Sequence, residues 1–135
     1  NIVVDPNQNF VNYVLTKNNK MISKCIANGY TASFEYEPLM GINYISQAKA
    51  VDLLQKGSIT IEDFEGDPTQ LISQGKIKEK AVINIKSVRF GNKEINDVPV
   101  VVNNKIPYDF LFNKKTLERV GMIIVDDINK LIIFE

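Results

Sequence analysis

The sequence predicts an all-β fold with two short helices. Three observations support this prediction. An Asn-Gly pair at residues 28–29 joins two runs of strand-forming residues, short apolar runs recur between turn residues along the chain, and helical spacing is clear in only two places. About nine or ten short strands of this kind are typical of a small closed or sandwiched β structure.

The first third of the chain reads as a lead-in followed by three strands. Residues 1–9 form the lead-in segment, which Asp5-Pro6 interrupts. Residues 10–17 alternate aromatic and β-branched side chains and predict one strand. Residues 21–27 and 30–37 predict the two strands of a hairpin around the Asn-Gly turn.

The clearest helix is predicted over residues 46–57. Ser46 is a good N-cap, and Gly57 fits the left-handed position after the last turn. Residues 58–68 predict a short strand and a turn that Asp67-Pro68 breaks.

The rest of the chain predicts more strands and a second helix. Strands are expected within 69–95, with turns at Gly75 and Gly91, and at 98–102 and 108–112. Residues 113–121 predict a two-turn helix that Gly121 ends, and residues 122–134 a closing hairpin. We expect residues 10–135 to form a single domain.

Composition excludes several functions. Lys and Arg together number 16, as do Asp and Glu, so a nucleic-acid partner is not expected. The absence of histidine excludes Ser-His and Cys-His nucleophile systems within the chain. Cys25 is the single cysteine, and we expect it to be a buried apolar residue. We expect no metal and no cofactor.

No apolar stretch is long enough to cross a membrane, so membrane insertion is not expected. Because the chain begins with Asn rather than Met, we expect that it has been trimmed. An export signal removed in this way would leave no trace.

The order of these segments resembles the retropepsin-like aspartic proteases, especially single-domain bacterial members. Four collinear segments carry the resemblance: CIANGYTASF (25–34), YISQAKAVDLLQKGSITIEDFEG (44–66), IKSVRFGNKEINDVPVVV (85–102) and LFNKKTLERVGMIIVDDINKLIIF (111–134). The resemblance implies a closed β-barrel of the acid protease type. Because many bacterial members are exported, it also favours an extracytoplasmic location, periplasmic or secreted.

The resemblance implies a catalytic Asp-Thr/Ser-Gly triplet, one from each subunit of a homodimer. Here the matching positions hold Glu37, Pro38 and Leu39. Glu is one methylene longer than Asp, Pro lacks the hydroxyl and the N–H, and Leu adds bulk. A displacement of about 1 Å can reduce a rate on the order of a hundredfold. The resemblance therefore implies a protease fold with a degenerate centre.

Two other family features have counterparts in this chain. Asn113 occupies the place of a glycine before the last helix, and Asn tolerates left-handed backbone well. Residues 66–77 occupy the place of the flap that closes over substrate, with Leu71 and Ile72 as its apolar tip. Leu71, Ile72 and Ser73 are therefore candidates for binding an extended peptide.

The acidic residues leave other interpretations open. Glu35 and Glu37 lie on one face of a strand, roughly 7 Å apart, and could act as an acid–base pair, as in glycoside hydrolysis. The alternative is a solvated strand end. The three carboxylates of residues 63–67 suggest calcium but lack the spacing of an EF-hand loop, so we expect an acidic turn.

The sequence therefore predicts a non-catalytic domain that binds a peptide or protein, or serves a structural role. One alternative is an aspartic-type endopeptidase that works as a homodimer with Glu37 in place of Asp. Another is a secreted interaction module unrelated to proteolysis, in which the third strand would feed no crossing loop and no flap would exist.

Overall fold

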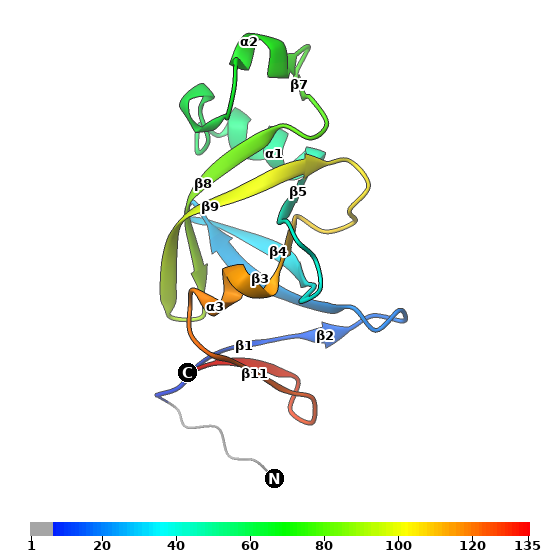
Figure 1. The fold of residues 1–135 in the computed structure, drawn as a ribbon, viewed down its shortest axis with the longest axis vertical. Helices are drawn as coiled ribbons and strands as arrows, with labels where there is room; N and C mark the ends of the chain where they lie inside the picture. The colour runs from blue at the N-terminus through cyan, green and yellow to red at the C-terminus, as the bar shows by residue number, and fades with distance from the viewer. Residues whose placement is uncertain (1–6) are drawn as a thin grey trace.

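The computed structural model describes residues 7–135, and its main feature is a closed barrel of six strands (Figure 1). Around the barrel the strands follow the order β3, β4, β10, β5, β9, β8, and β8 pairs again with β3. Their bounds are Met21–Ala27 (β3), Tyr30–Tyr36 (β4), Phe110–Phe112 (β10), Tyr44–Ser46 (β5), Lys93–Asn103 (β9) and Val82–Phe90 (β8). The prediction of a closed β structure is confirmed.

The β3–β4 hairpin and the first helix form as predicted. Asn28 and Gly29 both have positive φ, +48° and +86°, which suits a two-residue turn between twisted strands. Helix α1, Gln47–Gln55, begins after Ser46, whose hydroxyl accepts a hydrogen bond of 3.1 Å from the Lys49 amide. Gly57 has a φ of +73°, as expected for the residue that ends this helix.

The prediction of one strand over residues 10–17 is wrong. Strand β1, Asn9–Asn12, and strand β2, Val14–Leu15, belong to different sheets. Between them Tyr13 is buried, and its amide donates to Lys130 O at 3.0 Å. The chain passes from one sheet to the other at this buried residue. Of the predicted lead-in, residues 1–6 lie outside the described residues.

A second sheet covers the lower end of the barrel (Figure 1). It has the order β1-β12-β11, with β11 at Ile123–Asp126 and β12 at Leu131–Phe134. The predicted closing hairpin supplies two of its strands, and β1 adds the third.

Gly121 does not adopt the left-handed backbone conformation with which a glycine often ends a helix. A Cβ at this position would lie 2.8 Å from Glu135 O, so the glycine permits close approach of two chain segments.

Strands β8 and β9 change faces halfway along their length. In β8 the buried side chains are Ile83 and Ile85 before the change, and Val88 and Phe90 after it. Opposite this point on β9, Asp97 adopts a φ of +56°. The bend lets one long hairpin line the barrel at both ends.

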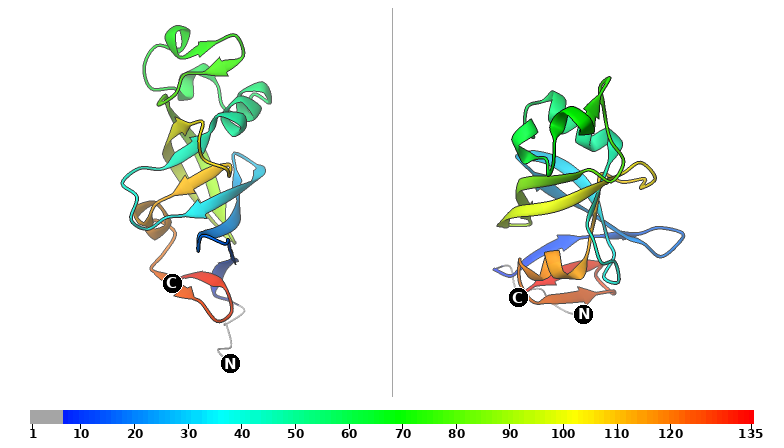
Figure 2. Two further views of the ribbon diagram at one scale, coloured as in Figure 1. Left: turned by 90° about the vertical axis from the view of Figure 1, so that its right-hand side faces the viewer. Right: turned by 45° about the horizontal axis from the view of Figure 1, so that its top comes forward.

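Residues 58–68 do not form the predicted strand. They contain the 3₁₀ turn η1, Ile61–Asp63, and lead into helix α2, Pro68–Leu71, which Asp67 caps. A hairpin follows, made of β6, Ile72–Ser73, and β7, Lys76–Ile77. Together with α1 these elements form the upper end of the molecule (Figure 2). With α3, Lys114–Glu118, the chain has three α-helices among the described residues, one more than predicted.

Aromatic rings fill the centre of the barrel. Phe34 and Phe90 meet edge to face with ring centroids 5.3 Å apart, and Phe112 lies 5.5 Å from each of them. Such contacts add about 0.5–1.5 kcal/mol per pair beyond the burial of area. Cys25 is buried in the same core, as predicted.

Candidate functional site

The loop of residues 37–43 is the candidate site, because it follows β4 at the point where the chain crosses the end of a neighbouring strand. Strand β10 lies between β4 and β5, parallel to the first and antiparallel to the second. The loop must therefore pass around the end of β10 to reach β5. The Glu37 amide donates to Phe112 O at 3.0 Å and fixes the start of the loop against β10.

Residues 37–40 form a tight turn in which the Glu37 carboxylate accepts a backbone hydrogen bond. The Met40 amide donates to Glu37 O at 3.2 Å, and the Leu39 amide donates to Glu37 Oε1 at 3.2 Å. The Leu39 side chain is 92% exposed at the tip of the turn. It therefore does not fill a cleft within this chain.

Asn43 anchors the other end of the loop and was not foreseen from the sequence. Its buried side-chain nitrogen, Nδ2, donates to Pro99 O at 3.1 Å and to Thr116 Oγ1 at 2.8 Å. Its Oδ1 accepts from the Asn113 amide and from Thr116 Oγ1, both at 3.0 Å. Asn43 thus joins the loop to β9 and to the start of α3. No local pattern reveals this role, because its partners lie far away in the sequence.

Asn113 does not use the left-handed backbone that Asn tolerates. Asn113 has a φ of −89° and a ψ of 174°, which is extended rather than left-handed. Its side chain caps α3 by accepting a 3.0 Å hydrogen bond from the Thr116 amide. The residue at the presumed glycine position therefore starts the helix.

Glu35 is not the solvated residue that we expected. It is 4% exposed, and its carboxylate lies 3.7 Å from Lys20 Nζ. The Glu35 and Glu37 carboxylates therefore engage different partners, Lys20 and the Leu39 amide. This arrangement gives no support to an acid–base pair.

The predicted flap is a hairpin, but its tip is not the predicted one. The turn is made by Gln74 and Gly75, with φ of +52° and +75°, whereas Leu71 and Ile72 pack against the core and Ser73 is exposed. Gln47 on α1 holds the hairpin, since its Nε2 donates to Ile77 O at 2.6 Å and its Oε1 accepts from the Ile77 amide at 2.8 Å. A peptide-binding role for Leu71, Ile72 and Ser73 stays a prediction.

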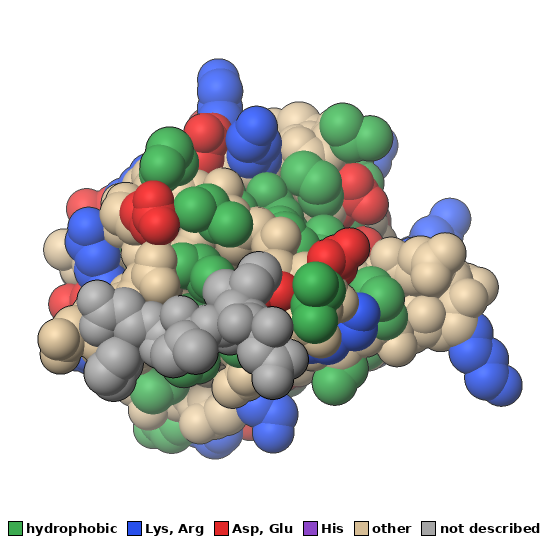
Figure 3. Space-filling model, turned by 90° about the horizontal axis from the view of Figure 1, so that it is seen from below, with side chains coloured by type: hydrophobic (Ala, Val, Ile, Leu, Met, Phe, Trp, Pro, Cys, Tyr) green, Lys and Arg blue, Asp and Glu red, His purple; other side chains and the backbone are tan. Residues whose placement is uncertain are grey.

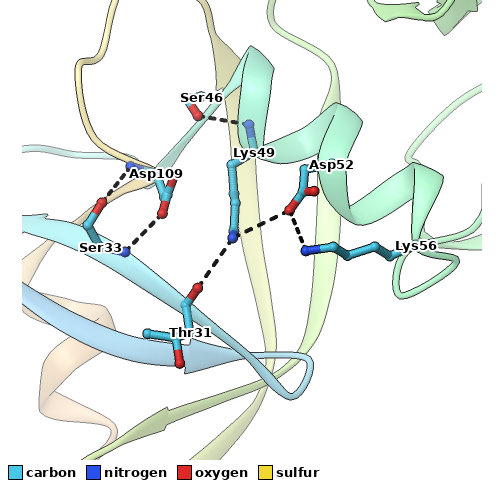
Figure 4. Close-up of polar contacts among 7 residues, drawn as sticks. All are labelled: Thr31, Ser33, Ser46, Lys49, Asp52, Lys56 and Asp109. Atoms are coloured by element: carbon cyan, nitrogen blue, oxygen red, sulfur yellow. Dashed lines mark hydrogen bonds and ion pairs between the residues drawn. The ribbon is translucent and has the colours of Figure 1, made fainter.

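A polar network fixes β4, β10 and α1 relative to one another (Figure 4). The Ser33 amide donates to the Asp109 carboxylate at 3.0 Å, and the Asp109 amide donates to Ser33 Oγ at 3.1 Å. From α1, Lys49 Nζ donates to Thr31 O at 3.3 Å and lies 3.6 Å from the Asp52 carboxylate. These contacts brace the strand that carries the candidate loop.

Two of the three acidic residues within 63–67, Asp63 and Asp67, serve structural roles. Asp63 accepts from the Thr60 amide at 2.9 Å and lies 3.7 Å from Lys86 Nζ, while Asp67 caps α2. Within residues 7–135 no group of acidic or cysteine side chains could hold a metal ion. The same part of the chain contains no helix with the length and apolar character to span a bilayer.

Apolar side chains also gather on the lower face of the molecule (Figure 3). Exposed apolar residues lie on β2, at Val14 and Leu15, and on β11, at Ile124 and Val125.

Comparison with known proteins finds similarity at the level of structure. No family model matches the sequence, and no curated protein matches it. The crystal structure of a retropepsin-like aspartic protease from Rickettsia conorii matches with a TM-score of 0.61 and 17% identity, covering 93% of this chain and 88% of that one. The retroviral protease-like domain of Ddi1 from Leishmania major matches with a TM-score of 0.51 and 10% identity, covering 98% and 96% of the two chains. The chain therefore has the retropepsin-like aspartic protease fold.

Proposed function

We propose that residues 10–135 form a catalytically inactive retropepsin-like domain that binds a peptide or protein. One observation carries the proposal. At the position that the resemblance assigns to the catalytic triplet, the Glu37 carboxylate accepts a hydrogen bond from its own turn, at Leu39. At the tip of the same turn the apolar Leu39 side chain is exposed, whereas Glu37 is half-buried.

The altered triplet argues against peptide hydrolysis. An aspartic protease needs two carboxyl groups that share one proton and activate water between them. The Glu37 carboxylate accepts a 3.2 Å hydrogen bond at Oε1 from the Leu39 amide, and its side chain is one methylene longer than Asp, so it would not take the position that such a pair requires. Pro38 supplies neither a hydroxyl nor an amide hydrogen to support a second loop.

The same loop is suited to binding. Leu39, Met40 and Ile42 are 92%, 37% and 46% exposed, so three apolar side chains stand out from one short segment. The segment is braced at Glu37 by β10 and at Asn43 by β9 and α3. Apolar anchors on a rigid support lose little entropy on binding and commonly dominate an interface. The exported location that the resemblance favours is compatible with this role.

The competing function is an endopeptidase formed by two copies of the chain. The position of Glu37, at the loop that rounds the end of β10, is the observation in its favour. In such a homodimer the two Glu37 carboxyl groups would face each other and share a proton. An interaction module with an unrelated fold is not supported, because β4 feeds a crossing loop and a hairpin occupies the flap position.

A cleavage assay separates the two functions. A broad peptide library is incubated with the parent chain, Glu37→Gln and Glu37→Asp between about pH 3 and pH 7, where carboxyl groups titrate. We expect all three proteins to leave the library intact, with circular dichroism confirming that each is folded. Cleavage by the parent that Glu37→Gln abolishes would instead establish the homodimeric endopeptidase.

A further inference from the structure

The charged side chains that line a shallow pocket beside the candidate loop are all positive. Its volume is about 430 Å³, within the usual range for ligand sites. Its apolar floor and its charged rim consist of Ile42, Val82, Pro99, Val101, Lys115 and Arg119. Among the described residues no Asp or Glu lines it. The rim therefore complements an anionic partner.

Lys115 lies on α3 and Arg119 directly follows this helix. Their side chains differ in how many of their donors are free to bind a ligand. Arg119 donates from Nη1 to Asp97 O at 3.1 Å and from Nη2 to Asn96 O, which holds the guanidinium in place. A guanidinium has five donors, so others remain for a carboxylate. Lys115 is exposed and forms no ion pair within residues 7–135.

The floor of the pocket continues the apolar surface of the candidate loop. Ile42 belongs to the loop and also lines the pocket, next to Val101 on β9. Both residues also line a neighbouring pocket of about 220 Å³, which reaches Lys80 and Glu79. The two depressions therefore adjoin at Ile42 and Val101, and we call the pair of them the groove. Asn43, which lies beneath the first pocket, has its hydrogen bonds satisfied, so the floor is preorganised.

We propose that this groove binds an extended peptide segment in which an acidic residue stands beside apolar ones. The apolar side chains would lie on Ile42, Val82 and Val101, and the carboxylate would face Lys115 and Arg119. At Val101, β9 pairs with both β5 and β8, and Pro99 O accepts from the Asn43 side chain, so recognition here rests on side chains and not on an added strand. The inference rests on the proposed peptide-binding function and names the chemistry of its ligand.

The test begins with selection from a phage-displayed library of short random peptides on the parent chain. Selected peptides are then measured by fluorescence anisotropy against Lys115→Glu, with Lys114→Glu as the matched control. Lys114 is an exposed lysine on the same helix and does not line the groove. Arg119 is left intact because it supports the bend of β9.

We expect selected peptides to combine Asp or Glu with apolar residues. Lys115→Glu should weaken their binding about tenfold, because attraction becomes repulsion, while Lys114→Glu should change it less than about twofold. Added salt should also weaken binding. Selected peptides that bind parent and Lys115→Glu equally would overturn the inference and leave the proposed function standing. A selection that enriches no peptide would overturn both.

Discussion

Asn43 and Thr116 lie 73 positions apart in sequence and exchange hydrogen bonds of 2.8 and 3.0 Å in the buried space beneath the candidate loop. This pair joins the end of the loop to the first turn of α3. The loop therefore has a fixed support, although its tip at Leu39 is exposed. Rigidity at the base and exposure at the tip are the properties on which the proposed binding function depends.

Replacing Asn43 by Ala should destabilise the fold strongly. The substitution removes four hydrogen bonds and leaves the Asn113 amide and Thr116 Oγ1 without this partner in a buried site. We expect the free energy of unfolding to fall by about 2–3 kcal/mol in urea titrations. Asn104→Ala, at an exposed residue, is the control and should have little effect. Equal stability of the two variants would show that the Asn43 contacts are not structural.

Replacing Gly121 by Ala should separate two chain segments. The new Cβ would lie 2.8 Å from Glu135 O, a distance that forces movement of backbone. We expect the thermal midpoint to fall clearly in a calorimetric scan. Gly41→Ala is the matched control, because a Cβ there meets nothing within 4 Å. A midpoint for Gly121→Ala as high as that for Gly41→Ala would contradict the close approach.

Cys25 should be inert in the folded protein. Burial, with a smaller contribution from the Asp109 carboxylate, raises the pKa of its thiol well above the ordinary value. The thiolate is the reactive form, so labelling by a maleimide at neutral pH should be slow. Denaturant should restore ordinary reactivity. Fast labelling under native conditions would mean that the barrel opens readily at β3.

Asp126 should make the closing hairpin sensitive to acid. Hydrogen bonds from the backbone and side-chain amides of Asn129, and from the Ile128 amide, lower the pKa of its carboxyl group. A folded pKa below the unfolded value of about 4 stabilises the fold above that pH, and this contribution is lost as the pH falls.

Thermal midpoints of Asp126→Asn and of the control Asp127→Asn test this effect. Asp127→Asn should lose stability between about pH 5 and pH 3, as the parent does, and Asp126→Asn should lose less. Identical pH dependence in the two variants would contradict the role of Asp126.

Local signals in the sequence identified several elements correctly. The Asn28-Gly29 turn requires positive φ at both positions, and Ser46 is an N-cap whose hydroxyl bonds within three residues. Both features depend on neighbours in sequence, so the hairpin and α1 could be predicted. The order of segments also sufficed to predict the barrel, which the structural comparisons support.

Features that depend on distant partners could not be predicted. Glu35 looks like a surface residue in sequence, but Lys20 on a neighbouring segment pairs with it in a buried position. The strand expected at residues 10–17 is broken because Tyr13 meets Lys130, more than a hundred residues away. In the candidate site the sequence located Glu37, Pro38 and Leu39, whereas Asn43 gave no local signal. The assignment of the first three residues to a catalytic position stays a prediction.

The most direct test of a non-catalytic binding role measures which peptides stay bound to the immobilised protein, and whether they are intact. The parent, Leu39→Asp and the control Ile128→Asp are immobilised, incubated with a peptide library and washed, and the retained peptides are identified by mass spectrometry. Ile128 is 75% exposed on a different turn, so its substitution controls for loss of an exposed apolar side chain. We expect the parent and Ile128→Asp to retain intact peptides and Leu39→Asp to lose them. Retention of cleaved fragments, or equal retention by all three proteins, would contradict a non-catalytic binding role for the loop.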